Sequence, residues 1–152
     1  HVRSRRQRQM CIRDSYREDR LVVVVPEQHA LAHSDSVAFA DVLEWDIVSL
    51  QAGSSISLAM RAAAAQAGHA LHQRIQVTSL DAMCRMIDNG LGVGLIPDRA
   101  FELMHGVGHL RALELSDDWA RRELSIVARD FDALPVTARL LVEHLSPPAS
   151  AS

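Results

Sequence analysis

The stretch from Arg74 to Pro97 constrains the fold of this chain more than any other. Its first part, Ile75 to Val77, alternates like a strand, and its last part, Val93 to Ile96, is short, apolar and followed by proline. Between them, apolar residues recur at the spacing of one helix face: Leu80, Met83, Cys84, Ile87 and Leu91. Strand, helix and strand within 24 residues predict a βαβ unit with a right-handed crossover in an open parallel sheet.

A second stretch repeats this arrangement earlier in the chain. Asp46 to Leu50 has the apolar character of a buried strand, and a polar turn with Gly53, Ser54 and Ser55 follows it. An alanine-rich helix is predicted from Ile56 to Ala67, ended by a glycine. Because the carboxyl ends of parallel strands meet at one edge of a sheet, both polar turns should line the same rim.

The second of these turns consists of Thr78 and Ser79, directly before the helix of the βαβ unit. The N–H groups at such a helix start have no partner within the helix, so they attract an anion without needing a lysine. The alternative is that the hydroxyl groups of both turns only cap their helices, which is their usual role. The sequence leaves both possibilities open at each residue.

The rest of the chain adds short elements to this frame. They are a strand at Leu21–Val25, a helix at Val37–Leu43 capped by Asp35 or Ser36, strands at Leu110–Leu115 and Leu124–Arg129, and a last helix at Pro135–Leu145. The tail at 146–152 is predicted to be disordered.

Charge divides the chain into a basic head and an acidic body. All 16 basic residues are arginine, and seven of them lie in residues 1–20, whereas the remaining residues carry nine arginines against sixteen acids. The acidic body is therefore a poor candidate for direct contact with DNA. The head lacks apolar periodicity, so we expect residues 1–20 to be disordered and foreign to the rest of the domain.

No apolar run is long enough to cross a membrane, and no segment reads as a signal peptide. Cys11 and Cys84 are the only cysteines, and Cys84 lies on the apolar face of a predicted helix. A structural disulfide is therefore not expected, which favours a reducing, cytoplasmic compartment.

The motifs that suggest catalysis or a cofactor fail on their context. Gly90, Gly92 and Gly94 lie between a helix and the following strand, whereas the dinucleotide fingerprint lies between a strand and the following helix. Close backbone packing explains Gly92 and Gly94 better, and Gly90 suits the left-handed residue that ends the preceding helix. Three histidine pairs, including His105 and His109, lack a third ligand, so no metal site is predicted. The serines have no assignable histidine and acid partners, so no catalytic residue is predicted.

The order of these segments resembles the effector-binding domain of LysR-type transcriptional regulators. The resemblance covers about Leu21 to Leu145, and we expect this range to form the domain. The segments that carry the resemblance are LVVVVPEQHALA, VAFADVL, VTSLDAMCRMIDNGLGVGLIPDRA, WARRELSIVARD and LPVTARLLVEHL. Its most specific part is the run Met-Ile-x-x-Gly-Leu-Gly-Val-Gly-Leu-Ile-Pro. One departure is Ala30, where the family usually has proline.

The resemblance implies an α/β fold of the type 2 periplasmic-binding-protein class, which is Rossmann-like and has two lobes. Leu21–Val25 would be the first crossover strand, Pro26 to about Arg122 the second subdomain, and Leu124–Asp130 the returning crossover. The DNA-binding domain, the linker helix and most of the first subdomain are absent from this chain. It therefore looks like mostly one lobe of a longer protein.

The resemblance also implies a function, which is to bind a small-molecule effector, here an organic anion, in a cleft between the lobes. The matching positions are Gly53, Ser54, Ser55, Thr78, Ser79, Gly94 and Pro97. The full-length protein would be a homo-oligomer that contacts DNA only through its N-terminal domain, without an enzymatic activity or a membrane contact. The alternatives are a periplasmic solute-binding component of a transporter and a small α/β enzyme. The sequence upstream of Leu21 would separate the regulator from the transporter component, through a helix-turn-helix in the first case and a signal peptide in the second.

Overall fold

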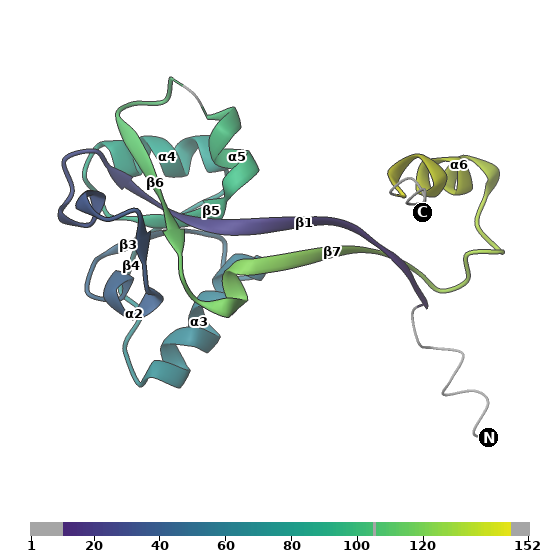
Figure 1. Cartoon of the computed structure of the whole chain (residues 1–152), viewed down its shortest axis with the longest axis horizontal. Coiled ribbons are helices and arrows are strands. Elements are labelled where there is room, and N and C mark those ends of the chain that lie inside the picture. The colour runs from purple at the N-terminus through teal and green to yellow at the C-terminus, as the bar shows by residue number, and fades with distance from the viewer. Residues whose placement is uncertain (1–10, 105, 147–152) are drawn as a thin grey trace. The chain divides into compact units, whose positions relative to one another are not determined.

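The computed structural model describes residues 11–104 and 106–146. His105, the segment 1–10 and the tail from 147 onward, on which expectations were stated above, lie outside the described residues. The chain divides into two compact units, one formed by Arg20–Arg121 and the other by the segments on either side of it. The elements are β1 Cys11–Pro26, η1 Ala30–His33, β2 Ser36–Val37, α2 Phe39–Val42, β3 Ile47–Leu50, α3 Ser55–Ala67, β4 Gln73–Val77, α4 Leu80–Asp88, β5 Gly94–Pro97, α5 Asp98–Leu103, β6 Leu110–Leu115, η2 Asp118–Ala120, β7 Arg121–Ala128 and α6 Val136–Leu145 (Figure 1).

Strand β1 is the centre of the main sheet. It runs antiparallel to β5 on one side and to β6 on the other, so that Val23 lies opposite both Leu95 and Leu113. Strand β2 joins β6 in parallel, and β7 also pairs with β1. The main sheet is therefore mixed. The predicted parallel arrangement is found where β3 pairs with β4, and in the parallel bridge between Ile47 and Val93 just before β5.

The β3–β4 pair is connected to the main sheet just before β5 begins. The N–H of Val48 donates to the carbonyl of Val93, and the N–H of Val93 donates to the carbonyl of Asp46, both at 2.9 Å. Strand β3 therefore lies between β4 and the start of β5. The predicted strand-helix-strand unit from Arg74 to Pro97 is present, with β3 between its two strands.

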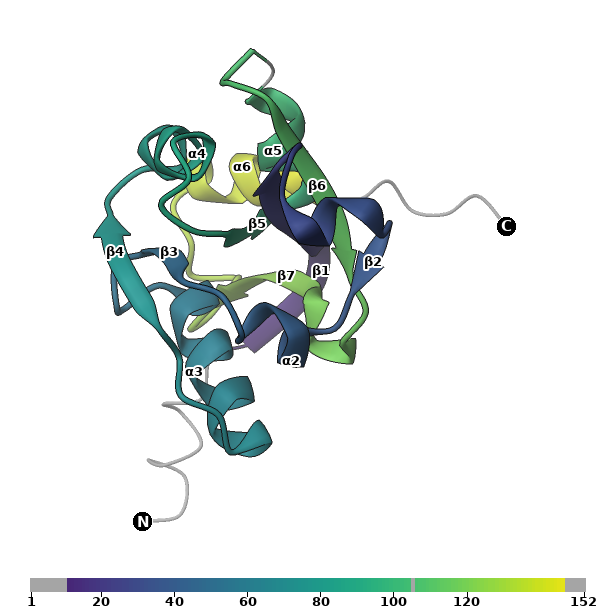
Figure 2. The same cartoon turned by 90° about the vertical axis from the view of Figure 1, so that its left-hand side faces the viewer.

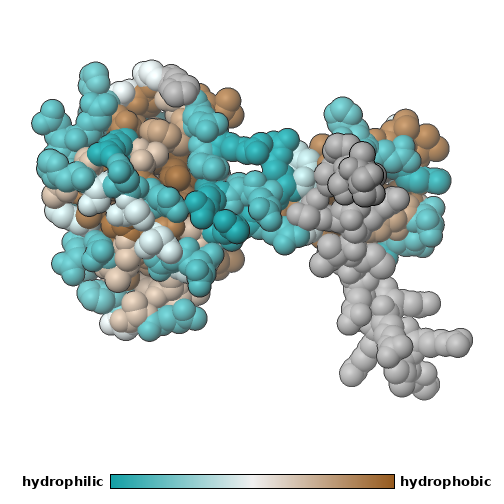
Figure 3. Space-filling view, viewed as in Figure 1, coloured by the Kyte–Doolittle hydropathy of each residue, from teal (hydrophilic) through white to brown (hydrophobic). Residues whose placement is uncertain are grey.

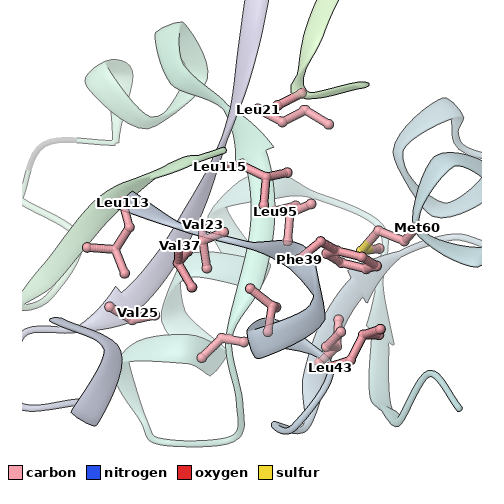
Figure 4. Packing of buried hydrophobic residues seen from close by; sticks show 14 of the residues in the cluster. Leu21, Val23, Val25, Val37, Phe39, Leu43, Met60, Leu95, Leu113 and Leu115 are labelled. Carbon is pink, nitrogen blue, oxygen red and sulfur yellow. The ribbon is translucent and has the colours of Figure 1, made fainter. Parts of the chain in front are cut away.

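Two apolar cores form because β1 is buried on both faces. Leu21, Val23 and Val25 point to one face, where they meet the side chains of α2 and α3 (Figure 4). Val24 points to the other face and belongs to the cluster formed with α4. Helices α2 and α3 thus cover one side, and α4 and α5 the other, in both views (Figures 1 and 2). The run of valines in β1 is explained by this double burial.

Helix α4 follows the predicted pattern closely. Met83, Cys84 and Ile87 are fully buried, as the spacing of the apolar residues indicates. On the exposed side, Arg85 forms an i,i+4 ion pair with Asp81 at 2.9 Å. The helix ends before Gly90, which has a φ of +79° and adopts the left-handed conformation expected of it.

The glycines after α4 are explained by close packing, as predicted. A Cβ on Gly92 would lie 2.4 Å from the carbonyl oxygen of Asp46, and one on Gly94 would lie 2.4 Å from the terminal methyl of Met83. Both contacts are far shorter than real carbon contacts. The glycines therefore bring the chain against β3 and α4, and they do not face a helix N-terminus.

Several boundaries differ from the sequence prediction, and the start of β1 differs most. Strand β1 begins at Cys11 and not at Leu21, so residues 11–20, which were expected to be disordered, belong to a strand. Helix α2 begins only at Phe39, and neither Asp35 nor Ser36 caps it. Instead, the Asp117 carboxylate accepts a hydrogen bond from the N–H of Phe39 at 2.8 Å, a cap supplied from 78 residues further along the chain.

The second unit contains the outer part of β1, most of β7 and α6. Arg122 donates from Nε and Nη2 to the two carboxylate oxygens of Asp19, at 2.8 and 2.6 Å, and this pair joins the two strands. In α6, Val142 is buried, but Leu141 is 56% exposed. Apolar residues gather on the exposed surface of α6 (Figure 3), among them Val136, Leu140 and Leu141.

Candidate functional site

The two polar turns do meet at one edge of the parallel pair. Leu50, the last residue of β3, is in register with Val77, the last residue of β4. The turns that follow are therefore neighbours, and they enclose an open cavity of about 490 Å³. Its lining consists of Leu50, Gln51, Gly53, Ser54 and Thr78. Both polar turns therefore lie at the same edge of the β3–β4 pair, as expected.

Each turn leads into a capped helix. The Ser54 hydroxyl oxygen accepts a hydrogen bond from the N–H of Ser57 at 3.1 Å, at the start of α3. The Ser79 hydroxyl oxygen accepts one from the N–H of Ala82 at 3.2 Å, at the start of α4. Capping is thus an actual role of both serines. Each hydroxyl still has a hydrogen to donate, and each helix start carries partial positive charge.

The turn between β3 and α3 is held by further hydrogen bonds. The N–H of Ser54 donates to the carbonyl of Gln51 at 3.0 Å, which closes the turn. The Ser57 hydroxyl, which is fully buried, donates to the carbonyl of Leu50, also at 3.0 Å. Hydrogen bonds to both ends of this short segment therefore determine its conformation.

The seven residues expected at the site separate into three groups. Gly53, Ser54 and Thr78 line the cavity. Ser55 and Ser79 are both exposed and lie beside the cavity. Ser55 is the first residue of α3, and Ser79 is the N-terminal cap of α4.

Gly94 and Pro97 form the third group and do not line this cavity. Gly94 is buried against the side chains of Met83 and Ile87. Pro97 pairs with Leu21 at the end of β5 and precedes α5. The structure therefore does not bring these two residues together with the other five.

Gln51 lines the cavity but was not among the expected site residues. It is exposed, and its side-chain amide has no hydrogen-bond partner among the described residues. The amide can both donate and accept, so it is equipped to contact a polar ligand. A signal was present in the sequence, because Gln51 is the first polar residue after a buried strand.

The lining of the cavity carries no charged side chain among the described residues. A negative ligand placed there would be held by hydroxyl groups, an amide and the starts of two helices. Helix starts are established sites for anions because their N–H groups point outward. The cavity is thus suited to a small polar or anionic group without a full countercharge.

Two other cavities are less suited to an anion. One of about 220 Å³ lies at the opposite edge of the parallel pair, near Trp45, and its Arg74 is paired with Asp46 at 3.5 Å. The other, of about 370 Å³, contains Arg20, which is paired with Glu114 at 3.0 Å. Asp117 and Asp118 also line it, so acids outnumber its two arginines.

Cys84 is a packed core thiol, as predicted. It is fully buried in the cluster around α4. Burial raises the pKa of this thiol, and the nearby negative charge of Asp81 raises it further. The neutral thiol is therefore favoured, and a neutral thiol is a weak nucleophile.

Groups of three or more side chains able to hold a metal ion are absent from the described part of the chain. Within residues 11–104 and 106–146, none of the helices has the length and apolar character required to cross a bilayer.

Solved structures with this architecture define the class of fold. The regulatory domain of CcmR from Synechocystis PCC6803, in complex with 2-PG, matches with a TM-score of 0.77 at 16% identity, over 91% of this chain and 67% of that one. The effector-binding domain of QuiR, in complex with shikimate, matches with a TM-score of 0.73 at 15% identity, over 90% and 63%. The chain thus has the α/β fold of type 2 periplasmic-binding-protein-like effector domains.

The sequence comparison identifies the family. The family model described as the LysR substrate binding domain matches residues 4–147, and the chain belongs to this family. The match includes much of the basic head. It supports a regulator domain and lends no support to a transporter component or a small enzyme.

Two curated relatives are transcriptional regulators. The RuBisCO operon transcriptional regulator of Allochromatium vinosum is 25% identical over 116 residues, which are 76% of this chain and 38% of that protein. The probable RuBisCO transcriptional regulator of Cyanophora paradoxa is 23% identical over 133 residues, 86% of this chain and 41% of that protein. The chain therefore spans about two fifths of the length of these relatives.

Proposed function

We propose that this chain is the ligand-sensing part of a LysR-type transcriptional regulator, and that its effector binds at the cavity between the starts of α3 and α4. The observation that supports this most directly is the shared edge of β3 and β4. There, Ser54 and Thr78 from two separate turns line one cavity of about 490 Å³. Ligands of open α/β sheets bind beyond the carboxyl ends of the strands, and this cavity has that position.

The proposed effector is a small organic anion. Hydroxyl groups and helix starts favour negative charge, and the described lining carries no acid that would repel it. Two proteins with this fold support the chemical class. QuiR was solved with shikimate and BenM with its effector benzoate, and both compounds are carboxylates at neutral pH. The side-chain amide of Gln51 would then form a hydrogen bond with a second polar group of the ligand, such as a hydroxyl.

The regulatory mechanism follows from linkage. An effector changes a regulator only through its different affinities for two arrangements of the protein. We propose that a second lobe of the full-length protein closes over the cavity, and that the ligand favours the closed arrangement. The full-length protein would be a homo-oligomer in the cytoplasm. It would contact DNA through a domain outside this chain, because the acidic body is unsuited to DNA.

Calorimetry with shikimate and benzoate as probes tests the cavity. The double variant Ser54→Val with Thr78→Val replaces both hydroxyl groups by methyl groups, and it adds one further methyl group at residue 54. We expect it to weaken binding by about 2–4 kcal/mol, because two polar contacts of a buried ligand would each lose about 1–3 kcal/mol, with partial compensation by water. The binding enthalpy at several probe concentrations gives the affinity directly.

The matched control is the single variant Ser54→Thr, which has nearly the shape of Ser54→Val but keeps the hydroxyl. It should bind like the wild type. Thermal unfolding of each variant verifies that the chain still folds, since Ser54 also caps α3. A double variant that folds and binds the probes as tightly as the wild type would contradict the proposed location of the site.

A further inference from the structure

Ser57 has contacts that reach beyond its own helix. It lies in the first turn of α3, and its side chain is fully buried. A serine inside a helix usually bonds back to the carbonyl three or four residues earlier. Ser57 instead donates to the carbonyl of Leu50, seven residues earlier, at the end of β3. The bond therefore crosses the whole turn between the strand and the helix.

The same residue also contacts the other side of that turn. Its backbone N–H donates to the hydroxyl oxygen of Ser54, at 3.1 Å. One residue thus holds Leu50 through its side chain and Ser54 through its backbone. Leu50 and Ser54 both line the cavity, whereas Ser57 does not. The spacing between the two lining residues is determined by a residue outside the lining.

We propose that Ser57 is a positioning residue for the effector cavity. This inference rests on the proposed function, because it assigns Ser57 a role in the same site. The hydroxyl holds the end of β3 at a set distance from the start of α3. Gln51 and Gly53, which lie on the intervening segment, are thereby directed toward Thr78. Without the hydroxyl, the Leu50 carbonyl would lose this hydrogen bond, and the segment would gain alternative conformations.

The chain contains a matched control for a buried serine. Ser49 is also fully buried, and its hydroxyl oxygen accepts a hydrogen bond from the side chain of Gln73 at 3.3 Å. It lies in β3, one residue before Leu50, but it does not contact the turn and does not line the cavity. Ser57→Ala and Ser49→Ala therefore each remove one buried hydroxyl, and only the first removes a contact with the turn.

Residue-resolved hydrogen exchange of the 152-residue chain, measured by NMR without a ligand, tests the positioning role. In Ser57→Ala, the N–H groups of Ser54 and Ser57 should exchange about tenfold faster than in the wild type, since a net hydrogen bond is worth about one tenfold step. The N–H of Val23, in the central strand, reports on global stability. In Ser49→Ala, the ratio of turn exchange to Val23 exchange should stay at the wild-type value.

The second measurement is calorimetry with shikimate and benzoate on the same three proteins. We expect Ser57→Ala to bind about tenfold more weakly than Ser49→Ala. Equal exchange ratios in the two variants would overturn the inference, and so would faster turn exchange combined with unchanged affinity. If the wild type binds neither probe, the choice of anion in the proposed function fails. The exchange ratios then decide alone whether Ser57 holds the turn.

Discussion

Gly92 offers a direct test of how the parallel pair is joined to the main sheet. The substitution Gly92→Ala would place a Cβ 2.4 Å from the carbonyl oxygen of Asp46 and 3.0 Å from its carbon. Both neighbours are backbone atoms, which cannot rotate away. Gly92 also has a φ of +154°, a conformation that side chains disfavour. The clash can be relieved only if the two segments separate.

The loss in the free energy of unfolding can be estimated from the hydrogen bonds that this separation would break. The hydrogen bonds Val48 N–H to Val93 O and Val93 N–H to Asp46 O, both 2.9 Å, join these segments. Their loss costs about 0.5–1.5 kcal/mol each. The strained backbone adds about 1–3 kcal/mol. We therefore expect the free energy of unfolding to fall by about 3 kcal/mol, a large part of the roughly 5–15 kcal/mol of a typical domain.

Urea unfolding followed by circular dichroism measures this loss. With a slope of about 1–3 kcal/mol per molar urea, the midpoint should fall by about 1–3 M. Gly53→Ala is the control, because a Cβ there meets no atom within 4 Å. It should change stability by less than about 0.5 kcal/mol.

Gly94→Ala should fall between these two variants. Its Cβ would lie 2.4 Å from the end of the flexible Met83 side chain, which can move, although the carbonyl oxygen of Val48 lies only 3.0 Å away. Overpacking of this kind costs about 1–3 kcal/mol.

If Gly92→Ala unfolds at the same urea concentration as Gly53→Ala, the close backbone contact with Asp46 is not a constraint on the fold, and the reasoning is refuted.

Two further predictions concern titrating groups. Burial lowers the pKa of His29 below its ordinary value of 6.5, and Nδ1 of this ring accepts a hydrogen bond from the N–H of Leu31. The unfolded chain therefore binds this proton more readily, so stability should be lost as the pH falls from about 6.5 through the folded-state pKa. Urea midpoints at about pH 7.5 and about pH 5.5 should differ less in His29→Gln than in the wild type, and equal differences would show that His29 does not contribute. Because burial and Asp81 raise the pKa of Cys84, iodoacetamide should label it on the order of 100-fold more slowly in native buffer than in urea, in a Cys11→Ser background. Equal rates in the two solvents would show that the thiol is accessible in the native chain.

Local patterns were sufficient to predict the elements around the cavity. The apolar spacing of Leu80, Met83 and Ile87 defined a helix face, and that face is buried or half-buried as expected. Gly90 ended the helix for a local steric reason. The common rim of the two turns was also predictable, because any two neighbouring parallel strands place their carboxyl ends at the same edge. These inferences needed only neighbours in sequence and one general rule of sheet geometry.

Contacts between distant segments were not predictable in the same way. The cap of α2 comes from Asp117, whose carboxylate accepts a hydrogen bond from the N–H of Phe39. The two residues are 78 positions apart in the sequence. The antiparallel pairing of β1 with β5 and β6 depends on the return of the chain to the same strand twice. A run of valines indicates burial on both faces, but it carries no information on the direction of the neighbouring strands.

The structure also separates capping from cavity lining, which the sequence left open. Ser79 caps α4 without lining the cavity, and Thr78 lines the cavity with no hydrogen bond from its side chain to the described residues. Ser54 does both, since it caps α3 and lines the cavity. A group whose oxygen already accepts from a helix N–H has only its hydrogen left for a ligand. Thr78→Val alone should therefore weaken probe binding without loss of stability. Ser54→Val alone should lower both the affinity for the probe and the free energy of unfolding. Equal stability losses in the two single variants would mean that Thr78 has a structural role as well, and the separation of the two roles would fail.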